Sequence, residues 1–144
     1  MPMQNSNDIV ITGIPRSGTT LTCHLLNKLP DVVALHEPMH PPKFFGAPFD
    51  EIIKEIKRFF NAQRNSLLSS GTAVSKSASG AVPDNPLGKI NEKTGKRERI
   101  INGRTIVVAK PIDHNFKLAI KHPSMFTALI GLVKDHFSCF AIIR

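Results

Sequence analysis

The sequence predicts a three-layer α/β domain built around a mostly parallel β-sheet. Three observations favour this fold class: a β-branched run at residues 9–11, a glycine-containing turn at 13–18, and a helix-forming segment that begins at Thr19. Three later apolar runs have the composition of buried parallel strands. They are centred near Val33, Leu118 and Phe140. The length of 144 residues suits one such domain, which we assign to 1–144.

The turn at residues 13–18 has the spacing of a phosphate-binding loop. Its two glycines are separated by four residues, and Thr19 and Thr20 follow. A glycine loop between a strand and a helix leaves backbone N–H groups aimed at one point, where the positive end of the helix dipole adds to them. The spacing is that of a P-loop, except that Thr19 stands where nucleoside-triphosphate enzymes carry a lysine. The sequence therefore predicts a P-loop-type domain whose cation lies inside the loop, as Arg16.

The segment after the loop predicts a helix and then a second buried strand. Leucines recur at helical spacing and should pack on the sheet, and Pro30 then ends the helix. Residues 31–35 form a short apolar run, so the strand–helix–strand order implies a right-handed crossover. Glu37 should emerge at the same sheet edge as the loop, where a carboxylate is a candidate general base. The leucines are Leu21, Leu25, Leu26 and Leu29.

The middle of the chain predicts a helix, a mobile insertion and a hairpin. Residues 50–61 place apolar and charged side chains on opposite faces, as in an amphipathic helix. Residues 62–97 are rich in Ser, Gly, Asn, Pro and Lys, which indicates a mobile loop or a partly ordered insertion. Beyond them, two β-rich runs flank Asn102 and Gly103, a pair that is the strongest short-range signal for a β-hairpin.

The last third of the chain predicts another strand–helix–strand unit. Residues 116–120 have the pattern of a core strand that ends at Lys121, and a helix should begin at Pro123 or Ser124. A last apolar strand at 137–143 then leads to Arg144. Because the carboxyl ends of parallel strands share one edge of a sheet, both strand ends should lie beside the glycine loop.

Composition narrows the class of protein. A formal net charge of +8 and a pI near 9.9 indicate attraction to polyanions, which include nucleic acid, a membrane surface and a substrate with several phosphates. No apolar run is long enough to span a bilayer and the N-terminus does not resemble a signal peptide, so we expect a soluble, cytoplasmic protein. Cys23 and Cys139 suit buried thiols, and no metal site is predicted.

Four motifs resemble those of one enzyme family. Residues 15–20, Pro-Arg-Ser-Gly-Thr-Thr, closely resemble the 5′-phosphosulfate loop of sulfotransferases that use 3′-phosphoadenosine 5′-phosphosulfate (PAPS), whose pattern is P-[KR]-S-G-T-[ST]. Glu37 in LHEP resembles the family's catalytic glutamate, and Lys121 in IKHP resembles the lysine that assists at the sulfuryl group. Arg144 in AIIR resembles the arginine that binds the 3′-phosphate.

The resemblance implies transfer of a sulfuryl group from PAPS to a hydroxyl or amine of an unknown acceptor, without a metal. It implies that Glu37 takes the acceptor's proton while Arg16 and Lys121 neutralise the developing charge. Cytosolic members use a histidine, so His36 stays open as the base, although strand alternation should let only one of the two residues face the substrate. The implied binding residues for PAPS are Pro15, Arg16, Ser17, Gly18, Thr19, Thr20 and Arg144.

Length limits what the resemblance implies for activity. The family carries its second 3′-phosphate ligand and its adenine contacts downstream of the arginine that Arg144 resembles, so we expect 1–144 to be the N-terminal part of such a domain. We therefore expect affinity for a 5′-phosphate with little transfer unless another chain completes the site. We also expect exposed apolar surface that favours self-association.

Two other functions stay open. A P-loop nucleotide kinase would share the fold, but it would need a lysine in place of Thr19 and an acidic Mg²⁺ ligand at a strand end. A non-enzymatic domain that binds a nucleotide or another polyanion would need neither group. Nucleic acid suits this second alternative poorly, because the chain has no Trp or Tyr to stack on bases.

Overall fold

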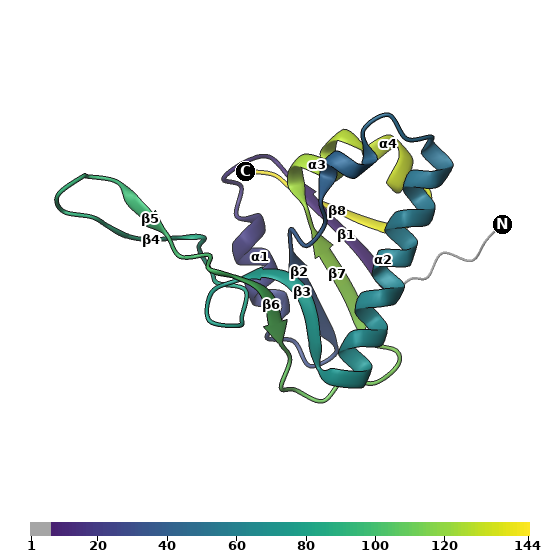
Figure 1. Cartoon of the computed structure of the whole chain (residues 1–144), viewed down its shortest axis with the longest axis horizontal. Coiled ribbons are helices and arrows are strands. Elements are labelled where there is room, and N and C mark those ends of the chain that lie inside the picture. The colour runs from purple at the N-terminus through teal and green to yellow at the C-terminus, as the bar shows by residue number, and fades with distance from the viewer. Residues whose placement is uncertain (1–6) are drawn as a thin grey trace.

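A four-stranded parallel sheet forms the centre of the molecule. The computed structural model describes residues 7–144, and its sheet has the strand order β2-β7-β1-β8 (Figure 1). The parallel pairing confirms the predicted α/β class and all four predicted core strands. The strands are β1 (Asp8–Gly13), β2 (Val32–His36), β7 (Lys117–Lys121) and β8 (Ser138–Ile142).

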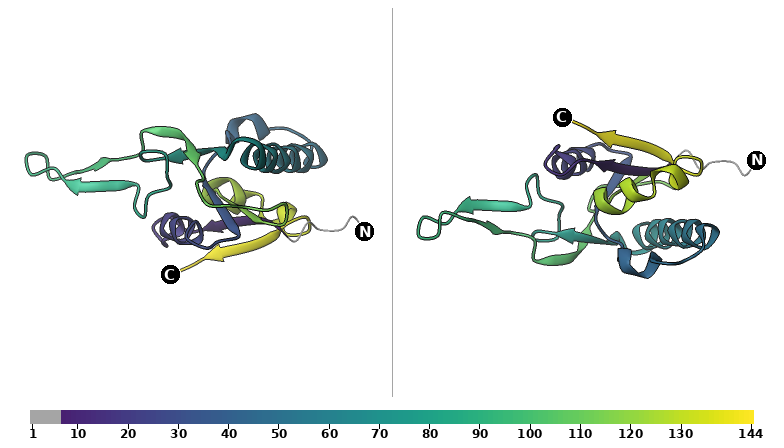
Figure 2. Two further views of the ribbon diagram at one scale, coloured as in Figure 1. Left: turned by 90° about the horizontal axis from the view of Figure 1, so that it is seen from below. Right: turned by 90° about the horizontal axis from the view of Figure 1, so that it is seen from above.

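Helices cover both faces of this sheet. The β1-to-β2 and β7-to-β8 connections cross the sheet in opposite directions, so right-handed crossovers place their helices on opposite faces. Figures 1 and 2 show α1 on one side and the other helices on the opposite side. The helix predicted from Pro123 is interrupted at Leu129. The helices are α1 (Thr19–Leu26), η1 (Pro41–Phe44), α2 (Phe49–Ser70), α3 (Pro123–Ala128) and α4 (Ile130–Val133).

The main core lies between the sheet and α2. Phe60 of α2 and Phe116, just before β7, are fully buried. The Phe60 ring stacks on Phe137 with centroids 5.2 Å apart, which joins α2 to the segment that enters β8. Each buried aromatic side chain removes a large apolar area from water, and this area stabilises the long crossover from β2 to β7.

The leucines predicted to pack on the sheet from the first helix do not form the buried face of α1, and the prediction is wrong for three of the four; Leu29 also lies beyond the end of α1. Leu21, Leu25 and Leu29 are about half exposed, whereas Cys23 is completely buried. The strands beneath α1 carry Ala34 and Ala119 side by side, and small side chains let the helix approach the sheet through Thr19 and Cys23 instead. The buried thiol of Cys23 is confirmed, and burial raises its pKa to about 12; both cysteines are free.

The segment 62–97, predicted as a mobile loop or partly ordered insertion, contains regular structure. The helix α2 continues to Ser70 because Gln63 and Leu67 extend its buried face. Gln63 then accepts a hydrogen bond from the Val74 N–H, which links the helix to the strand that follows. Composition alone did not indicate this strand, because its buried residues are small or carry hydroxyl groups. The segment holds β3 (Thr72–Ser77) and β4 (Leu87–Ile90).

The hairpin predicted at Asn102 and Gly103 is wrong. The two runs on either side of this pair, β5 (Arg97–Arg99) and β6 (Gly103–Val107), pair with β4 and β3 respectively, in two separate antiparallel sheets. Asn102 donates its N–H to the carbonyl of Ser77 in β3, which lies much earlier in the sequence. Pairing with these earlier strands therefore overrides the local turn signal. The β4–β5 ribbon extends away from the body of the molecule (Figure 1).

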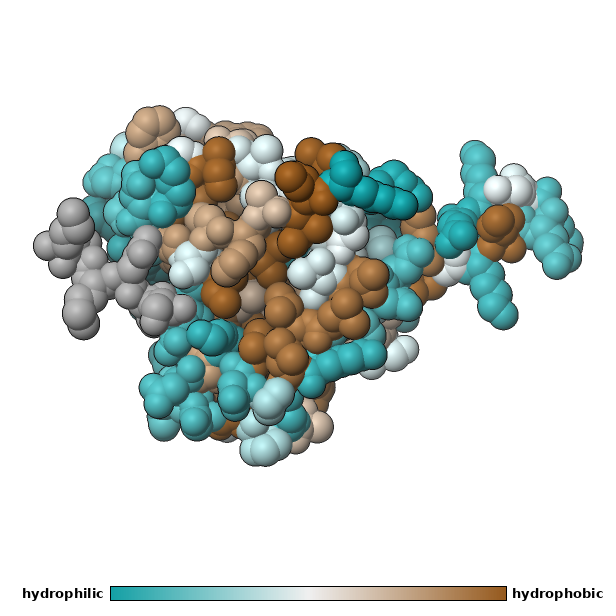
Figure 3. Space-filling view, turned by 180° about the vertical axis from the view of Figure 1, so that it is seen from behind, coloured by the Kyte–Doolittle hydropathy of each residue, from teal (hydrophilic) through white to brown (hydrophobic). Residues whose placement is uncertain are grey.

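One face of the molecule exposes hydrophobic side chains. The face that carries β8 and α1 shows them gathered across its middle (Figure 3). On β8, Phe140 is 56% exposed, and Leu25 of α1 is 50% exposed. This exposure agrees with the expected apolar surface, while self-association stays a prediction. Among residues 7–144, none of the helices has the length and apolar character needed to cross a bilayer.

Candidate functional site

Four strand ends place the candidate residues along one edge of the sheet. All four strands are parallel, so the loop after β1, Glu37 after β2 and Lys121 at the end of β7 emerge at the same edge. Arg144 lies two residues beyond the end of β8. The topology therefore assembles residues that are more than 100 positions apart in sequence.

The glycine loop joins β1 to α1 as the sequence predicts. Ser17 donates its N–H to the Ile14 carbonyl at 3.2 Å, which closes a turn, and Gly18 precedes the helix with φ 94°. Gly13 is tightly enclosed: a Cβ there would lie 2.9 Å from Thr19 Cγ2 and inside van der Waals contact of the Ile142 carbonyl of β8. The Ser17 hydroxyl is buried and has no hydrogen-bond partner among the described residues. Burial of a hydroxyl group without a hydrogen-bond partner costs free energy, and a polar group of a ligand in the loop would supply the missing partner.

We expect Gly13→Ala to disrupt the loop. The added methyl group would collide with the backbone of β8, which cannot move aside as a flexible side chain can. Overpacking of this kind costs about 1–3 kcal/mol of unfolding free energy. Urea denaturation measures this loss, and Gly131→Ala is the control, because a Cβ at Gly131 has nothing within 4 Å. Equal stability of the two variants would contradict the tight approach of β8 to the loop.

Lys121 connects the loop helix to the end of β2. Its ammonium group donates to Glu37 Oε1 at 2.9 Å and to Thr20 Oγ1 at 3.3 Å. The Lys121 side chain is only 4% exposed, whereas that of Glu37 is 25% exposed. A buried ammonium group needs such partners, because desolvation of an unpaired charge is expensive. The structure therefore brings together three positions that the sequence analysis selected from separate motifs.

A second lysine, Lys76 of β3, completes this cluster. Its ammonium group pairs with Glu37 Oε2, so each carboxylate oxygen faces one lysine. Lys76 is not among the site residues predicted from the sequence, because it lies in the segment predicted as an insertion. Hydropathy gives no signal for this strand, because Ser75 and Ser77 are buried whereas Val74 is exposed.

The electrostatic environment keeps Glu37 ionised. His36 and the ammonium groups of Lys76 and Lys121 hold the pKa of the Glu37 carboxyl well below its usual range, against the opposing effect of desolvation. The carboxylate is therefore available as a proton acceptor at neutral pH. Its proton affinity is low as long as both lysines face it.

The side chains of His36 and Glu37 lie close together and differ in exposure. Strand alternation should have separated the two side chains, but Glu37 has φ 44°, a left-handed conformation that ends the alternation. His36 Nε2 consequently lies 3.6 Å from Glu37 Oε1. Burial lowers the pKa of His36, whose side chain is 4% exposed. Of the two side chains, only Glu37 is exposed enough to meet an acceptor molecule.

The two candidate arginines are not drawn into the cluster. Arg16 and Arg144 are exposed, and neither forms an ion pair or a hydrogen bond within residues 7–144. Arg16 has φ 66°, a conformation that ordinary side chains adopt rarely. Pro15 is exposed as well, while Thr19 is buried beneath the loop. The site thus consists of a paired Glu–Lys–Lys cluster and a flanking loop whose arginine is free to bind an anion.

Comparisons with known proteins give no further assignment. No protein-family model matches the chain, and neither the search of curated proteins nor that of solved structures found a match. The function must therefore be argued from the residues of the site.

Proposed function

We propose that the chain is a sulfotransferase-type protein that transfers a sulfuryl group from PAPS to a hydroxyl or amine acceptor. The observation that carries this proposal is the Lys121 ammonium group, which bridges Thr20 at the start of α1 and the Glu37 carboxylate. The family resemblance assigns Thr20, Glu37 and Lys121 to one reaction centre. A chance resemblance in separate motifs would not require these side chains to touch.

The loop supports binding of the 5′-phosphosulfate end of PAPS. It precedes α1, whose first N–H groups and helix dipole favour an anion, and Arg16 adds a full positive charge. The unpaired Ser17 hydroxyl would gain a partner. Arg144, at the end of the neighbouring strand, would bind the 3′-phosphate. These are the residues that would hold PAPS, which supplies a sulfuryl group attached to a phosphate leaving group.

The chemistry of the chain's own residues is proton removal and charge neutralisation. Glu37 accepts the proton of the acceptor hydroxyl or amine as the acceptor forms its bond to sulfur and the bond from sulfur to the 5′-phosphate breaks. Lys121 and Arg16 neutralise the charge that grows on the leaving phosphate and on the sulfuryl oxygens. The other product is 3′-phosphoadenosine 5′-phosphate (PAP).

The pairing of Glu37 with two lysines allows substrate binding to change its proton affinity. While Lys121 and Lys76 both pair with Glu37, its proton affinity is low. When Lys121 shares its charge with an anionic substrate, Glu37 loses part of one stabilising contact and becomes a stronger base. Lys76 meanwhile keeps the carboxylate oriented. We propose that substrate binding itself thereby activates Glu37.

Ligand selectivity in a thermal unfolding experiment tests the proposal. At 100 times its dissociation constant, PAP should stabilise the full chain by about 2.7 kcal/mol, and ATP with Mg²⁺ should give a much smaller shift. Arg16→Gln should reduce the PAP shift, whereas Arg104→Gln, an exposed arginine of β6, should leave it unchanged.

The alternative functions predict other outcomes of the same experiment. A larger shift with ATP and Mg²⁺ than with PAP would instead indicate the nucleotide kinase. A larger, salt-sensitive shift with DNA or another polyanion would indicate the non-enzymatic binder. Under either outcome the sulfotransferase proposal would be abandoned. If PAP gives the largest shift, release of PAP from PAPS in the presence of a panel of hydroxyl and amine compounds would identify the acceptor.

A further inference from the structure

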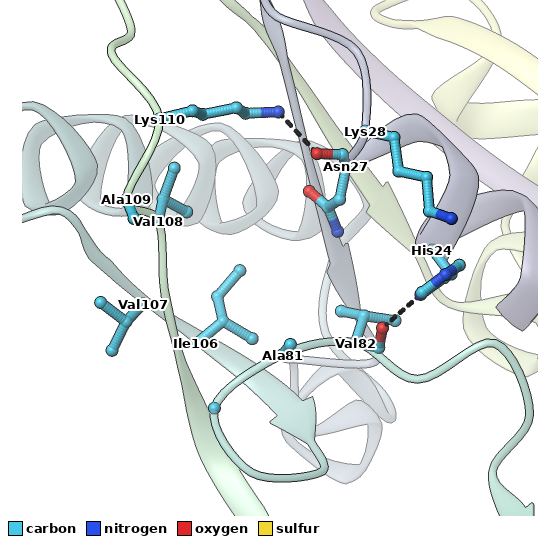
Figure 4. Close-up of a pocket in the computed structure, with 11 residues that line it drawn as sticks. His24, Asn27, Lys28, Ala81, Val82, Ile106, Val107, Val108, Ala109 and Lys110 are labelled. Carbon is cyan, nitrogen blue, oxygen red and sulfur yellow. Dashed lines mark hydrogen bonds between the residues drawn. The ribbon is translucent and has the colours of Figure 1, made fainter.

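A cavity of about 310 Å³ lies on the flank of the domain, between α1 and the chain around β6 (Figure 4). Its walls come from the end of α1 and the residues just after it, from the turn at residues 80–82 and from residues 106–110. This volume is at the lower end of the range for small-molecule sites. The cavity shares no lining residue with the Glu37 cluster, so it is a separate place on the molecule.

The two sides of the cavity differ in chemistry. Ile106, Val108 and Val82 form an apolar wall, and Val107 at the rim is 66% exposed. Figure 4 shows His24 of α1, and Lys28 just beyond this helix, across the cavity from Ile106 and Val107. Lys110 is a further cation among the lining residues, which include no Asp or Glu. An apolar wall facing positive charge suits a ligand that has an apolar body and an anionic end.

Two of the three basic side chains already form hydrogen bonds with backbone carbonyls. Lys110 donates to Asn27 O at 2.9 Å, to Leu29 O at 2.6 Å and also to Val32 O, which uses all three ammonium protons. His24 Nδ1 bonds to Val82 O at 2.9 Å, and because a carbonyl can only accept, Nδ1 carries the proton. Lys28 is exposed and has no ion pair or hydrogen-bond partner for its ammonium group within the described part of the chain.

We propose that this cavity binds a compact organic carboxylate, either an aryl or a short acyl carboxylate. Its apolar body lies against Ile106 and Val108, and its carboxylate pairs with Lys28 at the mouth. The fixed charge of Lys110 adds attraction without a hydrogen bond of its own. This site goes beyond the proposed sulfuryl transfer and does not depend on it.

Titration of the ¹⁵N-labelled full chain with 2-naphthoate tests the site by NMR. Saturable shift changes are expected at the backbone amides of Val82, Ile106 and Lys110, and the neutral analogue 2-naphthamide should bind at least several-fold more weakly. Lys28→Gln should weaken binding about 2–5-fold, the range for a solvent-exposed ion pair. Lys57→Gln on α2 is the charge-matched control and should bind as the parent does.

A variant that fills the cavity provides a second test of whether the carboxylate binds there. Ala81 is exposed and lines the mouth, so Ala81→Phe should abolish binding while an unchanged spectrum elsewhere shows that the fold is intact. No saturable binding, equal affinity for 2-naphthamide, or shift changes confined to the hydrophobic face around Phe140 would each overturn the proposal. Loss of PAP binding or of sulfuryl transfer has no bearing on it, because those readouts report the other site.

Discussion

Replacing Glu37 by Gln is expected to lower turnover of the completed enzyme by about 10²–10⁴-fold, the usual cost of losing a general base. Glutamine keeps the size and the polar character of the side chain but accepts no proton at neutral pH. The affinity for PAP should change little, because the loop and not Glu37 holds the phosphate in the proposed scheme. Sulfuryl transfer, measured where another chain completes the site, together with the thermal shift in PAP, separates the two effects.

The matched control is Glu55→Gln on α2. Glu55 is also a carboxylate that pairs with two basic side chains, Lys43 and Arg58, but its side chain is more exposed than that of Glu37 and does not belong to the cluster around Lys121. Its substitution should leave turnover unchanged. Near-normal turnover in Glu37→Gln would remove this residue from the mechanism and turn attention to His36.

The low pKa of Glu37 also makes the free energy of unfolding depend on pH. In an unfolded chain the carboxyl would titrate near 4.5, and in the folded protein its pKa lies well below that. Its ion pairs therefore contribute stability that is fully present above the unfolded pKa and is lost as the pH falls through the folded pKa. The difference in unfolding free energy between the parent and Glu37→Gln should be constant from about pH 7 to 5 and should shrink in more acidic solution.

The strand ends were the most predictable part of the site. Each core strand is a short apolar run, and parallel strands must present their carboxyl ends at one edge. Placing Glu37 and Lys121 side by side therefore required only the correct identification of β2 and β7, which pair directly. The contact between Lys121 and Thr20 then follows from the position of α1 on that sheet.

Lys76 and the pairing of β3 with β6 were not predictable in the same way. The buried residues of β3 include Ser75, whose hydroxyl accepts the His36 N–H at 2.8 Å, and hydropathy does not identify such a position as core. The pair Asn102 and Gly103 has the strongest local hairpin signal in the chain, yet the hydrogen bond from Asn102 N–H to Ser77 decides its conformation. Both errors come from hydrogen bonds between distant segments, which local patterns do not encode.

Replacing Lys121 by Ala is expected to lower turnover of the completed enzyme by about 10²–10⁴-fold as well, through loss of transition-state charge neutralisation. The variant should also be less stable than the parent, because the side chain is buried and its removal deprives Glu37 Oε1 of its closest partner. Turnover must therefore be compared at a temperature where circular dichroism shows both proteins to be folded.

A control on the same strand distinguishes the catalytic effect from a general loss of positive charge. Lys117→Ala removes a lysine from the exposed first position of β7, at the opposite end of the strand, and should leave turnover unchanged. If Lys121 neutralises charge on the transferring group, Lys121→Ala should lose turnover at saturating PAPS, not merely affinity for PAPS. A variant with normal turnover and only a raised KM would show that Lys121 serves substrate binding, and the proposal that its release activates Glu37 would then fail.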